Sequence, residues 1–195
     1  MVGRSVKLAP DREAVAAKAV RLAIKGMVVG GDRGVDAVRG LSLDVKGGEI
    51  LGIAGISGNG QRELAEAVSG LRPAKSGRVE IDGRAVDLRQ PKAVRGAGLA
   101  YVPEERMRDG AIGDFSVQEN LILLNHGEGA HCRRGFLRFD AIGAHCRQLV
   151  KAFAVKTPDL ETPTKNLSGG NIQKLILARE LSAEPKVIIA AQPTR

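Results

Sequence analysis

The fold of this chain is decided by the run Leu167-Ser168-Gly169-Gly170-Asn171-Ile172-Gln173-Lys174. Residues 170–181 follow with apolar side chains at helical spacing, which predicts a helix with one apolar face. A helix start carries unpaired amide donors and about half a positive charge, and the two glycines leave those donors open to an oxyanion. A Ser-Gly-Gly turn is also an ordinary helix N-cap, so this run needs a second motif beside it.

A second glycine-rich run reads Gly55-Ile56-Ser57-Gly58-Asn59-Gly60-Gln61-Arg62. It follows the apolar stretch 50–54, expected as a strand, and precedes an expected helix over 61–70. Such a joint binds phosphate because its glycines turn backbone N–H groups inward and the helix start adds positive charge. The usual pattern ends in Lys and Ser or Thr, where this chain has Gln61 and Arg62. Gln61 brings no charge and Arg62 offers magnesium no hydroxyl, so a ligand-free turn is the alternative for this loop alone.

The remaining segments alternate between strand and helix patterns, which predicts an α/β fold with a helical portion inserted around 115–165. Strands are expected at 21–29, 41–45, 78–81, 99–102 and 187–190, the last as a buried parallel strand. Ser116 and Glu119 form a capping-box pattern that predicts a helix start, and a further helix is expected over 140–154. Residues 1–19 read as a linker, 104–115 as a charged loop and 125–139 as irregular.

Composition limits the classes of partner. The net charge of +8 and the pI near 9.9 favour polyanions, such as nucleotides, nucleic acid or an anionic membrane surface. Aromatic residues make up only 3%, with Tyr101 the single tyrosine, which argues against base stacking on single strands. No apolar stretch is long enough to span a membrane, and Met1 is followed by charged and mixed sequence, so we expect no signal peptide.

Two His-Cys pairs, His131-Cys132 and His145-Cys146, offer soft metal ligands. Adjacent side chains on a helix point about 100° apart, so each pair chelates poorly. We therefore assign no metal site to them and expect surface helix residues instead. The two cysteines suit a reducing compartment.

Together the motifs resemble the nucleotide-binding domain of an ATP-binding cassette (ABC) transporter. More narrowly, the chain is similar to the second cassette of the tandem ATP-binding subunits of bacterial sugar and nucleoside importers. Besides the run at 167–174, the resemblance is carried by Met1-Val2-Gly3-Arg4 at a join between cassettes, by residues 52–61, by Tyr101-Val102-Pro103-Glu104-Glu105-Arg106 and by Ala190-Ala191-Gln192-Pro193-Thr194-Arg195.

The resemblance implies a P-loop NTPase core with an antiparallel β subdomain and an inserted helical signature subdomain. The cassette is expected over 20–195, after a linker at 1–19, with the helical subdomain at roughly 115–168. Because the family continues into further strands and a switch histidine, the resemblance also implies that this cassette is truncated at its C-terminus. The polypeptide alone is then expected to be poorly stable or aggregation-prone.

In this family two cassettes pack head to tail, and each ATP lies between the phosphate loop of one and the signature of the other. The resemblance therefore implies that Ser168, Gly169, Gly170 and Gln173 contact ATP held by a partner cassette. Residues 55–62 would form a second, degenerate nucleotide site. Ala191 takes the position of the magnesium-linked Asp and Gln192 that of the general-base Glu, so magnesium is expected only through the partner. Glu104 takes the position of a glutamine that couples nucleotide to the membrane subunits.

The function implied is transport-coupled ATP hydrolysis by a complex, with this chain inactive alone. Expected partners are a second cassette, permease subunits and, indirectly, a substrate-binding protein, at the cytoplasmic face of the cell membrane. The motif variants look most like cassettes that serve nucleosides or simple sugars. Two alternatives stay open: a stand-alone non-hydrolytic nucleotide-binding regulator, and a nucleic-acid-associated ABC protein, although no nucleic-acid partner is expected.

Overall fold

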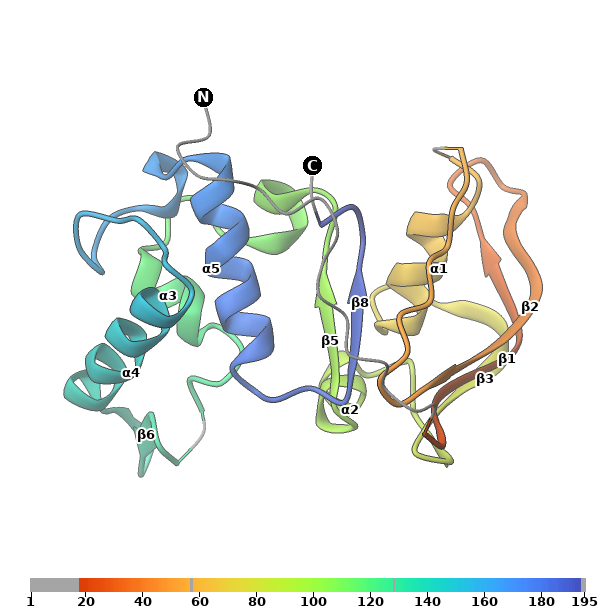
Figure 1. The fold of residues 1–195 in the computed structure, drawn as a ribbon, viewed down its shortest axis with the longest axis horizontal. Coiled ribbons are helices and arrows are strands. Elements are labelled where there is room, and N and C mark those ends of the chain that lie inside the picture. The colour runs from red at the N-terminus through yellow and green to blue at the C-terminus, as the bar shows by residue number, and fades with distance from the viewer. Residues whose placement is uncertain (1–17, 57, 128, 194–195) are drawn as a thin grey trace.

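The computed structural model describes residues 18–56, 58–127 and 129–193. A four-stranded sheet, a two-stranded parallel sheet and a helical part follow one another across the molecule (Figure 1). The expected linker lies outside the described residues except for residues 18 and 19, as do the tandem-join marker at 1–4, Ser57, Thr194 and Arg195.

The antiparallel sheet has the strand order β2-β1-β3-β4. Its strands are β1 (Val20–Gly30), β2 (Asp36–Lys46), β3 (Ala74–Ile81) and β4 (Arg84–Ala85). On β2, Leu41, Leu43 and Val45 are half-buried while the polar residues between them are exposed, so the predicted alternation is confirmed. The strands predicted at 21–29, 41–45 and 78–81 are all present.

Helix α1 (Gln61–Val68) packs on the sheet and shares its core, since Leu64 and Val68 join Met27, Val29 and Val79 in one buried cluster. The same cluster reaches α2 (Pro91–Gly96) through Val94 and the parallel strands through Leu99 and Val187. The glycine loop before α1 is therefore fixed on a continuous apolar core.

The parallel pair consists of β5 (Leu99–Val102) and β8 (Val187–Ala190), in register from Leu99 opposite Val187 to Val102 opposite Ala190. Both predicted strands are confirmed, but β8 is not fully buried as expected. The Ile188 side chain is 51% exposed. Among the described residues β8 pairs only with β5, so one flank of the strand stays open.

The strand expected over Ile50–Ala54 is wrong. The segment has no regular structure, and Ile50 and Ile53 are 87% and 55% exposed. A strand requires a neighbour for its backbone N–H and C=O groups. No strand within the described ranges pairs with this segment, so its apolar pattern alone does not produce a strand.

The helical part contains α3 (Val117–Ile122), α4 (Phe139–Ala152) and α5 (Gly169–Leu181). Its own buried cluster includes Leu121, Ile142, Cys146 and Leu175. The capping box is confirmed: Glu119 N donates to Ser116 Oγ at 3.2 Å, and Ser116 N donates to Glu119 Oε2 at 2.8 Å. The stretch expected as irregular contains a short hairpin of β6 (Cys132–Arg133) and β7 (Phe136–Leu137).

Helix α5 differs from the expected helix with a single apolar face. It lies between the helical cluster and a third cluster that contains Val102, Ala111, Ile172 and Ile176, so its residues are buried on most sides. Before it come η1, a π-helical turn at Arg106–Gly110 inside the expected charged loop, and η2, a 3₁₀ turn at Thr164–Asn166. The orientation of α5 therefore depends on its packing against two buried clusters rather than on a single apolar face.

Candidate nucleotide site

The glycine loop is held against the antiparallel sheet at its last glycine. Gly60 has φ 92°, and a Cβ there would collide with the carbonyl oxygen of Ala37 on β2. Only glycine meets both demands, the left-handed backbone and the close approach. Gly58, also at positive φ, and Asn59 are exposed, so the middle of the loop remains open to a ligand.

Gln61 begins α1 at the position where the motif normally has lysine. Its amide group lies directly over Gly55, because a Cβ on Gly55 would collide with Gln61 Nε2. No side chain caps the start of α1 at Gly60, so the first backbone N–H groups of the helix stay available to an anion. The loop thus offers backbone donors, and an uncharged amide in place of an ammonium group.

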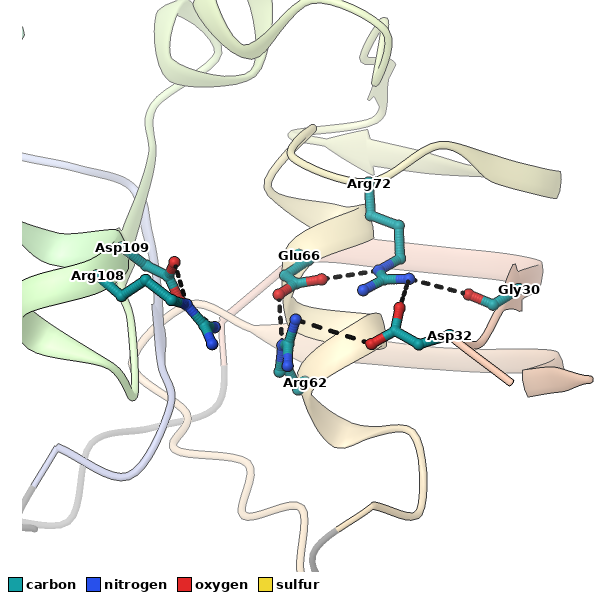
Figure 2. A network of polar contacts seen from close by, with 7 residues as sticks. All are labelled: Gly30, Asp32, Arg62, Glu66, Arg72, Arg108 and Asp109. Carbon is teal, nitrogen blue, oxygen red and sulfur yellow. Dashed lines mark hydrogen bonds and ion pairs between the residues drawn. The ribbon is translucent and has the colours of Figure 1, made fainter. Parts of the chain in front are cut away.

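Arg62 points away from the loop and into a network of ion pairs (Figure 2). Its Nε donates to Glu66 Oε1 at 2.7 Å, and Glu66 Oε2 accepts from Arg72 Nε at 2.7 Å. Arg72 Nη1 also donates to Asp32 Oδ1 at 2.8 Å and to Gly30 O at 3.3 Å. The network ties α1 to the turn that follows β1.

The network pairs the positive charge of Arg62 with a carboxylate. The hydrogen bond and charge of Glu66 raise the pKa of Arg62 above its usual value, and the Arg72 guanidinium lowers the pKa of Asp32. Arg62 therefore stays fully charged and forms an ion pair with Glu66. It supplies neither a hydroxyl for magnesium nor a free cation for phosphate.

The signature run forms the exposed start of α5. Ser168, Gly169 and Gly170 are all exposed, and Ser168 Oγ accepts a hydrogen bond from Asn171 Nδ2 at 3.0 Å. The first backbone hydrogen bond of this turn is donated by Asn171 N–H to Ser168 O at 2.8 Å. The amides of the two glycines therefore face outward, as anion capture requires.

Gln173 does not share this exposed tip. Its residue is only 8% exposed, and Nε2 has no hydrogen-bond partner among the described residues. The structure therefore brings together three of the four signature residues that the sequence singled out.

Arg106 connects the tip to the loop after β5. Its Nη1 donates to Gly169 O at 3.2 Å. Four residues later Gly110 is packed so closely that a Cβ would lie 2.6 Å from Ile176 Cδ1. The loop that carries Glu104 is thus packed against the first two turns of α5.

The ends of the two parallel strands bring the remaining predicted residues together. Ala191 N donates to Val102 O at 2.9 Å, so Ala191 and Gln192 lie beside the start of the loop that holds the half-buried Glu104. In Figure 1 these strand ends, the glycine loop beside α1 and the start of α5 all lie toward the upper edge. The carboxyl ends of parallel strands are where α/β folds bind ligands.

The donor set fits nucleotide phosphate and does not fit magnesium. The exposed backbone at Gly58 and the start of α1 suit an oxyanion. A magnesium ion needs oxygen ligands from the protein, and the two positions that would supply them hold Arg62, paired to Glu66, and Ala191.

The expectation that the two His-Cys pairs are surface helix residues is wrong, because His131 and Cys146 are buried and Cys132 lies in β6. Cys146 is buried in the helical cluster, and burial raises the pKa of its thiol to about 11, which disfavours the thiolate that binds metals. The His131 and His145 rings lie 4.9 Å apart between centroids. Within residues 18–193, excluding the undescribed positions 57 and 128, no group of three His, Cys, Asp or Glu residues is placed to hold a metal ion.

A family model described as ABC transporter matches residues 38–195. The chain belongs to the ABC transporter family. The antiparallel sheet, the parallel strands and the helical part are thus the parts of an ABC cassette with its P-loop NTPase core, as predicted.

Curated relatives come from importers. The guanosine import ATP-binding protein NupO of Bacillus subtilis (strain 168) is 41% identical over 195 residues, all of this chain and 38% of that protein. The nucleoside import ATP-binding protein NupA of Lactococcus lactis subsp. cremoris is 40% identical over the same share of each chain. The ribose import ATP-binding protein RbsA 1 of Rubrobacter xylanophilus is 38% identical over 200 residues. This ABC chain spans 38% of the length of each of them.

Solved cassettes share the fold. A dimeric ATP-binding cassette in a post-hydrolysis state with ADP and phosphate superposes with a TM-score of 0.69 at 23% identity, covering 89% of this chain and 74% of that one. A nucleotide-free ABC cassette gives a TM-score of 0.68 at 20% identity, covering 90% and 70%. None of the helices in the described parts of this chain is long and apolar enough to cross a membrane.

Sequence reasoning missed the side-chain contacts that hold the site in place. Arg62 and Glu66 are spaced as a helical i, i+4 pair, and this spacing was the available signal. Asp32, Arg72 and the contact of Arg106 with Gly169 join segments far apart in the chain, and no local pattern reports them.

Proposed function

We propose that this chain is the degenerate cassette of an ABC importer, and that it lends its signature to a partner cassette that hydrolyses ATP. The proposal rests on a contrast between the signature tip and the chain's own phosphate loop and strand ends. The tip at Ser168–Gly170 is open and equipped for an oxyanion, while Gln61, Arg62, Ala191 and Gln192 lack the chemistry for cleavage.

The division of roles follows from side-chain chemistry. An amide such as that of Gln192 has no useful basicity toward water, so it cannot act as a general base. Ser168 Oγ and the amides of Gly169 and Gly170 can bind the terminal phosphate of a nucleotide held by the partner. ATP bound in this chain's own loop would be held through the backbone of Gly58 and the first turn of α1, and magnesium would enter only with the partner.

The position of the chain within its transporter is part of the same proposal. The three relatives are named as import ATP-binding proteins for guanosine, nucleosides and ribose, which supports a nucleoside or simple sugar as the cargo. We place the chain as the second cassette of a tandem subunit, over 20–195 with a helical subdomain at roughly 115–168. It would work with permease subunits at the cytoplasmic face of the membrane, with the Glu104 loop facing them.

The test is a steady-state ATPase measurement on a complex of this chain with a hydrolysis-competent ABC cassette. Ser168→Glu sets a carboxylate against the phosphate and is expected to lower turnover by at least about 100-fold, the cost of losing one preorganised oxyanion donor. Ser76→Glu adds the same charge at an exposed position of β3 and should leave turnover unchanged. Equal turnover in both variants would refute the proposal. This chain alone should show no magnesium-dependent ATP cleavage.

A further inference from the structure

The short β6–β7 hairpin lies between α3 and α4 in the chain and carries an unusually exposed aromatic side chain. Arg133 on β6 pairs with Phe136 on β7. The two residues between the strands, Arg134 and Gly135, have φ of 53° and 84°, the left-handed backbone that a two-residue hairpin turn requires. The turn therefore has a defined shape, and Phe136 follows it directly.

The hairpin and the start of α4 leave apolar surface uncovered. Phe136 is 79% exposed, and Phe139, the first residue of α4, is 68% exposed. The chain has four phenylalanines, so half of them lie on the surface within four residues of each other. Neither belongs to any of the three buried clusters. Exposed apolar side chains that occur together mark an interaction surface, whereas single ones do not.

Positive charge accompanies these two rings. Residues 131–140 contain one carboxylate, that of Asp140, and three arginines, Arg133, Arg134 and Arg138. All three arginines are exposed, and none forms a side-chain hydrogen bond or ion pair with another described residue. The other exposed apolar run, at 50–56, contains no charged residue. The combination of phenylalanine with unpaired arginine is therefore particular to the hairpin.

This combination suits the surface of an anionic bilayer. Phospholipid headgroups attract guanidinium groups, and aromatic rings favour the boundary between the headgroups and the acyl chains. A stable protein interface takes about 20–30 residues a side, more than a hairpin of six residues offers. A fluid layer of headgroups adapts to a small tip, so the hairpin fits a bilayer better than an acidic protein.

We propose that the β6–β7 hairpin binds the surface of an anionic lipid bilayer, with Phe136 at the edge of the acyl chains and the arginines among the headgroups. Attachment by the hairpin alone is weak and reversible, because stable anchoring takes more than one signal. In Figure 1 β6 lies at the lower edge of the helical part, away from the start of α5 at the upper edge. The contact therefore leaves the signature tip open. It goes beyond the proposed function, because it needs neither a permease nor a nucleotide.

The test is tryptophan fluorescence, since the chain has no tryptophan of its own. Phe136→Trp places the reporter on the hairpin, and Val35→Trp places it at an exposed position between β1 and β2. Each variant is titrated with vesicles of phosphatidylcholine and with vesicles of equal parts phosphatidylcholine and phosphatidylglycerol. The anionic vesicles are expected to shift the emission of Phe136→Trp to shorter wavelength, and brominated acyl chains to quench it, without effect on Val35→Trp.

Two outcomes of this titration overturn the proposal. The first is an unshifted spectrum of Phe136→Trp, as expected if the hairpin contacts an acidic protein instead of lipid. The second is the same shift at both positions, which would mean that the chain adsorbs without using the hairpin. Neither outcome bears on the role of Ser168, because no ATP is present in the measurement.

The arginines are tested in the Phe136→Trp background. The hairpin variant changes three residues to glutamine: Arg133, Arg134 and Arg138. Each basic residue near an anionic surface contributes about fivefold, so the three changes are expected to weaken vesicle binding about 100-fold. The control variant changes three exposed cations elsewhere to glutamine: Arg33, Arg84 and Lys92. It should bind nearly as the parent does, and equal losses in both variants would overturn the assignment to the hairpin.

Discussion

At the scale of single residues, the glycine loop is packed closely on the antiparallel sheet, and its last two positions carry neither lysine nor a hydroxyl. Gly60 still meets the Ala37 carbonyl and still has the left-handed backbone that the loop needs. Gln61 and Arg62 occupy the adjacent positions without distorting α1, because Glu66 holds the arginine along the helix surface. This combination of a retained backbone and altered side chains supports the proposal of a degenerate nucleotide site.

Restoring the two residues should restore tight nucleotide binding. Gln61→Lys with Arg62→Ser supplies the missing charge and hydroxyl, and we expect ATP affinity in magnesium to rise by about tenfold or more, the worth of one charge-assisted hydrogen bond. Calorimetric titration with and without magnesium measures the change. Gln148→Lys with Arg147→Ser, on exposed positions of α4, is the matched control. Equal affinity of both double variants would contradict the reading of the loop.

Tyr101, on β5, reports on the packing between this strand and its surroundings. Burial, followed by the negative charges of Glu66 and Asp109, raises its pKa to about 12. The unfolded chain titrates near 10. The protonated phenol therefore stabilises the fold fully below pH 10, and this stability is lost as pH rises toward 12. As the only tyrosine, it can be followed by phenolate absorbance; a midpoint near 10 in the folded chain would be the contrary outcome.

The residues of the candidate site were chosen by residue identity, because the motif positions are consecutive, and their roles stay predictions. Gln61, Arg62, Ala191 and Gln192 could be assigned by counting from glycines and prolines. What could not be predicted is where Arg62 points. Its partner Glu66 is itself held by Arg72, which in turn binds Asp32 forty residues away, and such a chain of contacts exists only after folding.

At the scale of elements, Asn120 of α3 holds the segment that leads into the signature run. Asn120 is fully buried, and its Nδ2 donates to Thr164 Oγ1 and to Ile112 O, both at 2.9 Å, while its Oδ1 accepts from Ile112 N at 2.9 Å. One side chain thus joins the loop before α3 to the 3₁₀ turn before α5. Buried amide networks of this kind fix one arrangement because every alternative leaves a group unpaired.

Removing that amide should loosen the signature end of the helical part. Asn120→Leu leaves backbone groups of Ile112 without partners and is expected to cost about 3 kcal/mol of unfolding free energy. Asn166→Leu makes the same exchange at an exposed position nearby and should cost little. Urea denaturation monitored by circular dichroism measures both. Similar midpoints for the two variants would show that Asn120 does not fasten these segments.

Local signals predicted elements well where the element is stabilised locally. The capping box at Ser116 and Glu119 and the alternation on β2 needed no knowledge of the rest of the chain. The helix predicted at 170–181 is present as α5, but its expected single apolar face and the strand expected at 50–54 were wrong for the opposite reason. A strand needs a neighbour, and the buried Arg179 and Glu180 show that α5 is set by what surrounds it.

At the scale of the whole molecule, two large cores lie on either side of a smaller cluster that joins α5 to β5. The first joins the antiparallel sheet to β5 and β8, and the second belongs to the helices. Beside them, Ile50, Ile53, Ile56 and Ile188 are all more than half exposed. Exposed apolar residues beside unpaired backbone favour association between chains.

The purified chain should therefore aggregate, and polar substitutions should slow this. Ile50→Thr with Ile53→Thr removes two exposed apolar side chains and is expected to reduce light scattering on heating about severalfold, with little change in unfolding free energy because neither side chain is buried. Ile142→Thr, in the buried core, should instead destabilise the fold and increase scattering. Identical aggregation of the parent and the double variant would point to another surface.

The close packing of Gly110 on Ile176, with Arg106 bound to Gly169 O, has a mechanical consequence. No slack separates the segment after β5 from the first turns of α5. We therefore expect any displacement of that segment to be transmitted directly to the serine tip.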